Sequence, residues 1–430
     1  MLKADIGRAF LTVRTAITTA ALISALLACQ GGSHRLSNET ASGSRASFVP
    51  EDLLLREPIP SDFPQVLSRD AKQQDLDLLL YAFETAYGGF SYLPSADRDA
   101  FIQRLAQFRE NVRPGGCTEF CDELGDLLWT LPDSHFRALR LKVLCGKRRL
   151  AEERQPAVGE NIGLELARSS QRDYAFQERR VRTAQIGILS IVGLHDPDDQ
   201  RWLGYDEALQ GLIKYPVLVI DLRGLPGGND HNGYRLAELL IGRTIDAGKG
   251  RRREIIRQDP GSFALRINLW RYFISQAELR KEAIADSIWK YLKEDQTSFR
   301  LAKDGKLPRE KIEIGEQPSF GPGETSYRGA IYVLIDAKCA SSCESTLEAL
   351  QLHPNVKTLG ENTRGMIHFT NEGMIQLPGS HLFVRMATKF NDYERFIEKV
   401  GHEPDIRVPK GQDAFEYLIE HQLPAAFPGG

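Results

Sequence analysis

Apolar residues recur three and four positions apart in the first third of the chain, which is the spacing of one face of a helix. The spacing is present in Asp75–Phe83, in Phe101–Phe108 and in Glu119–Leu131. Arg113-Pro-Gly-Gly116 interrupts it, because proline and paired glycines break helices. We therefore predict an N-terminal helical region over residues 51–150, ending in the Ser134-His135 motif.

The pattern changes near residue 184, where short apolar, β-branched runs begin to alternate with helical segments. Such runs are typical of buried strands, and their alternation with helices is typical of an α/β domain. We predict an α/β core over residues 184–410, with helices at 205–214, 234–241 and 343–352 and strands at 186–192, 217–223, 330–335, 356–360, 373–377 and 382–388.

Residues 245–325 interrupt the alternation of strands and helices. This insertion is aromatic and charged, and Leu265–Leu292 has the pattern of one long helix. A polar, weakly patterned stretch connects the helical region to the core up to about residue 183. Residues 411–430 are expected to form a C-terminal tail.

The first 28 residues have the layout of an export signal. Lys3, Arg8 and Arg14 precede an apolar run, Ala16–Ala28, that is too short to span a bilayer comfortably. The run ends in Leu-Leu-Ala-Cys29, which resembles the lipobox of bacterial lipoproteins and implies a lipid anchor on Cys29. A plain secretory signal is the alternative.

Gln30 follows the candidate lipidation site, where an aspartate would indicate retention in the inner membrane. The resemblance therefore implies a bacterial cell-envelope protein anchored in the outer membrane at its periplasmic face. Residues 29–50 are rich in Ser, Gly and Ala and are expected to be a flexible tether. The net charge of −3 argues against nucleic acid as a partner.

Ser341 follows the apolar run Gly329–Ile335 and precedes Glu344–Leu350, which has the pattern of a helix start. Small residues between the two predict a tight turn. A serine on such a turn has its hydroxyl at the edge of the sheet and a helix N-terminus behind it. A nucleophile and an oxyanion hole can be built there together.

The cysteines offer a second feature of this turn. Five of the six cysteines follow Cys29, so at least one thiol is free or intermolecular, although export permits disulfides. Cys339 and Cys343 flank Ser341, and Cys117 and Cys121 have the same spacing without zinc-site histidines. We expect no metal site. We also expect buried thiols with at most one disulfide; the alternative is a disulfide or thiol that controls the Ser341 turn.

Gly227 and Gly228 follow the strand that ends near Asp221. A glycine pair permits positive φ and close backbone approach, so that bare N–H groups can face a ligand. The sequence matches neither the phosphate-binding loop nor the dinucleotide fingerprint. By itself, the pair fits a strand-to-helix turn equally well.

Taken with the Ser341 turn, the glycine pair belongs to a set of ordered motifs. They are Asp221-Leu-Arg-x-x-x-Gly-Gly228, Ala340-Ser-x-x-Glu344, Gly360-Glu-x-Thr-x-Gly365 and Gly401-x-x-Pro-Asp-Ile406. Their order and spacing resemble the serine peptidases of the C-terminal processing (tail-specific) and tricorn-core family over about residues 120 to 408. The resemblance implies a crotonase/ClpP-like α/β core of βα units, preceded here by the helical region.

The resemblance also implies roles for individual residues. Ser341 matches the nucleophile, because it stands three residues before Glu344. Gly228 matches the glycine whose backbone N–H forms half of the oxyanion hole, and the N–H of Ser342 would supply the other half.

The general base separates two branches of this family. Processing peptidases have a lysine directly after Gly360–Gly365, where this chain has Met366, which cannot accept a proton. The tricorn-type branch uses a Ser-His pair after a helical region and a glutamate shortly before Gly-x-x-Pro-Asp. Ser134-His135 and Glu398 match that branch, with His135 as base and Ser134 as its partner, held by Glu398.

Two functions remain open at this point. The first is a serine-type endopeptidase, free of cofactors, that cleaves peptides or unfolded proteins; the second is an inactive relative that binds a periplasmic peptide or ligand. His368 competes with His135 for the role of base, and His402 occupies the first variable position of the last motif. His195 lies in an acidic run that we interpret as a solvated turn rather than a metal site.

The stretch between His135 and the strand at 186 is too short for the PDZ domain that processing peptidases carry there. The insertion 245–325 is then the best candidate for a lid or substrate wall. Its aromatic residues give it apolar faces, although packing between helices would explain the same residues: Trp270, Tyr272, Phe273, Trp289 and Tyr291.

Overall fold

The computed structural model describes residues 47–55, 59, 63–140, 143–146, 159–181, 184–245, 248–315, 320–321 and 323–423. The candidate export signal, Cys29 and the tether up to residue 46 lie outside these residues. No helix within the described ranges is long and apolar enough to cross a membrane.

A six-stranded sheet forms the centre of the core, in the order β14-β11-β10-β7-β6-β5. Neighbouring strands run parallel, except for the antiparallel pair β5 and β6. The strands are β5 (Tyr174–Val181), β6 (Ala184–Ile191), β7 (Val217–Asp221), β10 (Ala330–Ile335), β11 (Val356–Gly360) and β14 (Ile406–Arg407).

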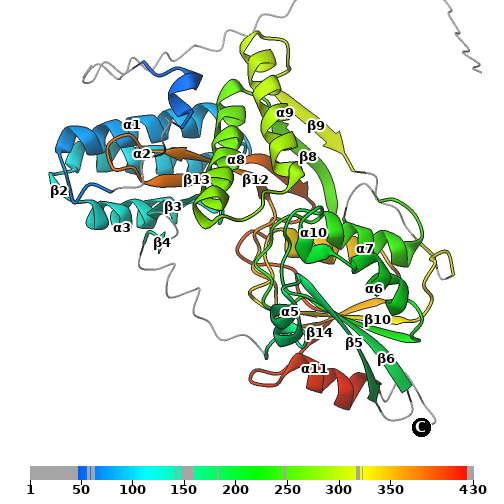
Figure 1. Ribbon diagram of the computed structural model, residues 1–430. Helices are drawn as coiled ribbons and strands as arrows, with labels where there is room; N and C mark the ends of the chain where they lie inside the picture. The colour runs from blue at the N-terminus through cyan, green and yellow to red at the C-terminus, as the bar shows by residue number, and fades with distance from the viewer. Residues whose placement is uncertain are drawn as a thin grey trace, which may run out of the picture. The chain divides into compact units, whose positions relative to one another are not determined.

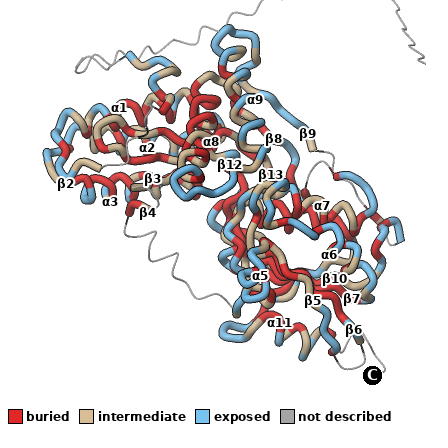
Figure 2. The backbone as a smooth tube through the Cα atoms, in the orientation of Figure 1, coloured by how far each residue is buried: buried red, intermediate tan, exposed pale blue. Residues whose placement is uncertain are grey.

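Both faces of this sheet are covered, which explains why its central strands are continuous apolar runs. Leu218 and Ile220 of β7 pack with one cluster, and Val217 and Val219 pack with another on the opposite face. The first cluster includes α6 (Tyr205–Leu212), α7 (His231–Ile241) and α10 (Ser342–Leu350); the second includes α11 (Ala414–Tyr417). Figure 2 shows β6, β7 and β10 as buried.

A second sheet has the order β4-β3-β13-β8-β9, and β12 pairs with β13. Its strands pack against the N-terminal helices and the helices of the insertion, in a core separate from that of the first sheet. The elements are α1 (Arg69–Thr85), α2 (Ser95–Asn111), α3 (Cys117–Leu128), β3 (Arg137–Arg140), β4 (Val143–Leu144), β8 (Arg251–Arg257), β9 (Glu310–Ile314), β12 (Phe369–Gln376) and β13 (Phe383–Tyr393).

The α/β fold with preceding helices is therefore confirmed, but one expectation was wrong. The insertion holds two helices, α8 (Pro260–Arg280) and α9 (Asp286–Lys303), rather than one long helix over Leu265–Leu292. Lys281 ends α8 in a left-handed conformation, and α9 packs against α8. The weakly patterned stretch also contains α5 (Leu164–Ser170) and β5 in its described part.

The cysteines form more disulfides than expected. Cys121 pairs with Cys145, Cys339 pairs with Cys343, and Cys117 is a buried free thiol. Sequence spacing could not identify the first pair, because Cys145 reaches Cys121 only once β3 and β4 have folded against α3.

Candidate active site

Ser341 lies between β10 and α10, on a turn with an unusual backbone. Its φ is 56° and its ψ is −119°, a conformation that a residue with a side chain rarely adopts. The backbone N–H of Ser341 donates to Glu344 Oε2 at 3.0 Å. The turn therefore presents the Ser341 side chain at the N-terminus of α10, where partial positive charge favours a developing anion.

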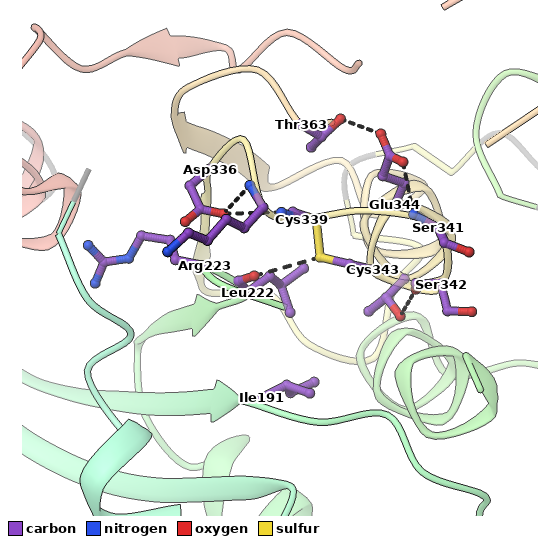
Figure 3. The surroundings of a disulfide bond; sticks show 12 residues. Ile191, Leu222, Arg223, Asp336, Cys339, Ser341, Ser342, Cys343, Glu344 and Thr363 are labelled. Carbon is purple, nitrogen blue, oxygen red and sulfur yellow. Dashed lines mark hydrogen bonds between the residues drawn. A yellow bond between two sulfur atoms is a disulfide. The ribbon is translucent and has the colours of Figure 1, made fainter. Parts of the chain in front are cut away.

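Glu344 also connects this turn to the Gly360–Gly365 segment. Its Oε1 accepts hydrogen bonds from Thr363 Oγ1 at 2.6 Å and from the Gly365 amide at 2.8 Å, and its Oε2 accepts one from Met366 at 2.7 Å. Figure 3 shows Glu344 bonded to both Thr363 and Ser341. Burial raises the pKa of Glu344, and the hydrogen bond from Thr363 opposes that rise. Two of the sequence motifs thus meet at one carboxylate.

Gly228 lies beside Ser342 at the start of α10. The Ser342 hydroxyl donates to the Gly228 carbonyl at 2.6 Å. Gly228 has a φ of 147°, and a Cβ on it would stand 2.0 Å from the carbonyl oxygen of Leu194. Only glycine fits at this position without displacing its neighbours. The two predicted oxyanion residues therefore lie together next to Ser341.

His135 reaches the same place from the N-terminal helical region. It precedes β3, which pairs antiparallel with β13, and the neighbouring Phe136 ring stacks on Tyr87 with centroids 5.4 Å apart. His135 Nε2 lies 3.2 Å from Ser341 Oγ. This is hydrogen-bond distance between a weak nucleophile and a histidine, the arrangement needed for proton transfer.

Asp133 is a buried carboxylate that sequence reasoning missed. Its Oδ1 accepts the His135 backbone N–H at 2.6 Å and stands 3.9 Å from His135 Nδ1. The signal in the sequence was the run Pro132-Asp-Ser-His135, because an aspartate commonly caps an amide two residues ahead in a turn. Burial raises the pKa of the Tyr87 phenol well above its usual range, and the charge of Asp133 adds to the effect.

Glu398 lies behind Ser134-His135 and contacts the backbone of Ser134. Its Oε1 accepts the Ser134 backbone N–H at 3.1 Å, and its Oε2 accepts the amides of Ile367 and His368, each at 3.1 Å. Burial raises the pKa of Glu398 well above its ordinary value, and the charge of Asp133 raises it further. The buried Asp133 carboxyl group therefore disfavours the charged form of Glu398.

His368 occupies a different environment. Its Nε2 accepts the Ile397 N–H at 2.9 Å, and its Nδ1 donates to the Asn391 carbonyl at 3.0 Å. Burial lowers the pKa of His368 to about 4. Both ring nitrogens are engaged away from Ser341, which removes the geometric basis for His368 as the base.

His402 and His195, the two further histidines considered from the sequence, also have partners away from the serine. His402 Nε2 lies 2.9 Å from Glu348 Oε1, and His195 Nδ1 lies 2.8 Å from Asp173 Oδ2. Among the described residues, the donor atoms of Asp133, His135 and Glu398 could hold a metal ion, since they lie within 4.8 Å of one another. The contact between His135 and Ser341 favours proton transfer by this cluster over metal binding.

The insertion contacts the loop that follows β6. The N–H and hydroxyl of Ser287, in the first turn of α9, donate to Asp198 at 3.0 and 2.7 Å. In the same loop, Asp196 Oδ1 accepts from Asn229 Nδ2 at 2.9 Å, and Asn229 directly follows Gly228. Among the insertion's aromatic residues, Tyr272 is buried against Phe383 and Trp289 is exposed.

The chain is similar to several solved structures at low sequence identity. Mature CPAF is 13% identical with a TM-score of 0.50, covering 84% of this chain and 98% of its own. A lipoprotein from Streptococcus agalactiae is 15% identical with a TM-score of 0.41, covering 80% of this chain and 92% of its own. The photosystem II D1 C-terminal processing protease is 15% identical with a TM-score of 0.31, covering 55% of this chain and 48% of its own. At these identities the similarity to CPAF shows the fold. No curated protein matches the chain.

The family is shown by the sequence of the core itself. Residues 185–408 match peptidase family S41, and this segment contains the glycine pair, the Ser341 turn and Glu398. Within the described part of the chain, the residues between His135 and β6 form β3, β4, α5 and β5 and no PDZ domain. Because the match spans just over half of its residues, the chain belongs to peptidase family S41 and is a serine peptidase by that membership.

Proposed function

We propose that this peptidase is a serine-type endopeptidase that cleaves peptide bonds through an acyl-enzyme on Ser341. The observation that carries the proposal is the 3.2 Å contact between His135 Nε2 and Ser341 Oγ. His135 takes the Ser341 proton as the oxygen attacks a peptide carbonyl, and then gives it to the leaving amine. Water, activated by the same histidine, hydrolyses the acyl-enzyme.

The backbone N–H groups of Gly228 and Ser342 stabilise the tetrahedral intermediate. The hydrogen bond from the Ser342 hydroxyl to the Gly228 carbonyl supports this role, because it holds the two residues together next to the nucleophile. Removing one such donor typically costs about 10²–10³ in rate. Ser134, Glu398 and Asp133 position His135, with Asp133 supplying the negative charge that stabilises the imidazolium.

The substrate is a peptide or an unfolded protein segment, which lies between the oxyanion residues and the insertion. Contacts from Ser287 to Asp198 and from Asn229 to Asp196 support α9 as one wall of this site.

In this proposal the protein acts in the cell envelope, anchored through a lipid on Cys29. Membrane fractionation of Cys29→Ala tests the anchor, and unchanged membrane association would contradict it.

A fluorophosphonate probe tests the catalytic proposal, since it reacts with an activated serine hydroxyl. The wild-type protein should gain one probe by intact mass, and peptide mapping should locate it on Ser341. Ser341→Ala should lose both labelling and hydrolysis of an unfolded protein substrate. An unlabelled wild-type protein would instead support the inactive, peptide-binding relative, and labelling that survives Ser341→Ala would place the nucleophile elsewhere.

A further inference from the structure

The Cys339–Cys343 disulfide closes the turn that carries Ser341. The two cysteines are four positions apart, and Ser341 is the middle residue of the closed loop. Figure 3 shows the sulfur–sulfur bond of this turn next to the Leu222 carbonyl. The cross-link therefore joins the last residues of the turn to the first turn of α10.

The disulfide also lies against the segment that leads to the oxyanion glycine. Cys343 Sγ is 3.6 Å from the Leu222 carbonyl oxygen, and the Ala340 N–H donates to the Leu225 carbonyl at 3.2 Å. That segment continues into Gly227, where a Cβ would stand 2.7 Å from the Ala340 carbonyl oxygen. The backbones of the nucleophile turn and of the oxyanion segment thus meet at the cross-link.

The conformation of Ser341 needs such a constraint. Its positive φ is unfavourable for a residue with a side chain and persists only where the surroundings hold it. Glu344 holds the turn from one side through the Ser341 N–H. The disulfide adds a second restraint, because Cys339 cannot move apart from Cys343.

We infer that Cys339 and Cys343 are positioning residues, whose disulfide holds Ser341 and the Ser342 N–H in the reactive geometry and so makes peptidase activity depend on their oxidation. This inference rests on the proposed function. A dithiol reductant would add two electrons and two protons to the cystine, giving two thiols and becoming a disulfide itself. Both cysteines are fully buried, so this exchange requires the turn to open first.

The chain supplies a matched control in its other disulfide, Cys121–Cys145, which closes a longer loop with a separation of 24 residues. Longer loops give the larger loss of unfolded-state entropy, so the control pair should contribute more to thermal stability. Cys339→Ala/Cys343→Ala should lower kcat/KM and the rate of fluorophosphonate labelling roughly 10- to 100-fold, mainly through kcat, because small displacements of reacting groups have effects of that size. Cys121→Ala/Cys145→Ala should show the larger fall in Tm and keep most of the activity.

Hydrogen exchange over residues 336–350 gives a readout that does not depend on catalysis. Exchange at the Ser341 turn should accelerate in Cys339→Ala/Cys343→Ala and stay at the wild-type rate in the control variant. Unchanged exchange, or a kcat/KM within twofold of wild type, would overturn the positioning role even if Ser341 is the nucleophile. If exchange is faster in Cys339→Ala/Cys343→Ala but the fluorophosphonate never labels the wild-type protein, the disulfide still restrains the turn. That result would reject only the proposed peptidase chemistry.

Discussion

His135 Nε2 and Ser341 Oγ lie 3.2 Å apart although 206 positions separate the two residues in the chain. Two contacts bring them together. The strand after His135 pairs with β13, and Lys399 Nζ donates to the Leu131 carbonyl at 2.8 Å. Since Lys399 adjoins Glu398, the loop that carries the glutamate also holds the segment that carries the histidine. The candidate site is therefore assembled by the docking of the helical region on the core.

Replacing the two competing histidines should separate their roles. His135→Ala should lower kcat/KM by about 10²–10⁴, the range that a general base contributes, without a comparable loss of stability. His368→Ala should reduce the Tm, because it removes a buried ring with two hydrogen bonds, while the folded fraction keeps most of its activity. Activity per folded molecule, with folding measured by circular dichroism, is the test. Full activity in His135→Ala together with none in His368→Ala would reverse the assignment.

The two carboxyl groups behind His135 should respond differently to neutralisation. Asp133→Asn keeps an oxygen for the His135 amide but removes the charge that stabilises the imidazolium, so kcat should fall by about 10²–10⁴. Glu398→Gln should cost less, because burial and the charge of Asp133 raise the pKa of Glu398 and so disfavour its charged form. Steady-state kinetics of the two variants decide the matter. A larger loss in Glu398→Gln would show that the glutamate carries the charge.

The local parts of this site were readable from the sequence, whereas the parts made by distant contacts were not. The Ser341 turn follows from an apolar strand, small residues and a helix start, and the conformation of Gly228 follows from a glycine pair after a strand. The break at Lys281 was missed because the apolar spacing continues across it. The docking of α9 on Asp198 depends on packing between segments far apart in the chain, whereas Asp133 was missed although its bond from the His135 amide is local.

Two glycines with positive φ allow a test of the oxyanion segment. Gly228→Ala would place a Cβ 2.0 Å from the Leu194 carbonyl oxygen, so the backbone and its N–H must move. We expect kcat/KM to fall by about 10²–10³, the effect of losing one oxyanion donor. Gly224→Ala is the matched control, because its φ is 76° but its Cβ would meet nothing within 4 Å. It should lose about 1–2 kcal/mol of stability from the left-handed backbone and little activity. Equal activity losses in both variants would argue against a specific role for Gly228.

The environment of His368 predicts that stability falls in acid. Burial lowers the pKa of His368 to about 4 from the 6.5 of an exposed imidazole, so between these values the unfolded chain binds a proton that the folded chain does not. The stabilisation from the neutral ring is therefore complete above pH 6.5 and is lost as the pH falls toward 4. The loss amounts to about 3 kcal/mol at most, and protonation of Nε2 would break its bond from Ile397. Urea unfolding at several pH values should show this slope in the wild-type protein. In His368→Asn the slope should flatten, whereas the same substitution at the exposed His231 should leave it in place. A wild-type slope retained in His368→Asn would assign the acid sensitivity to other groups.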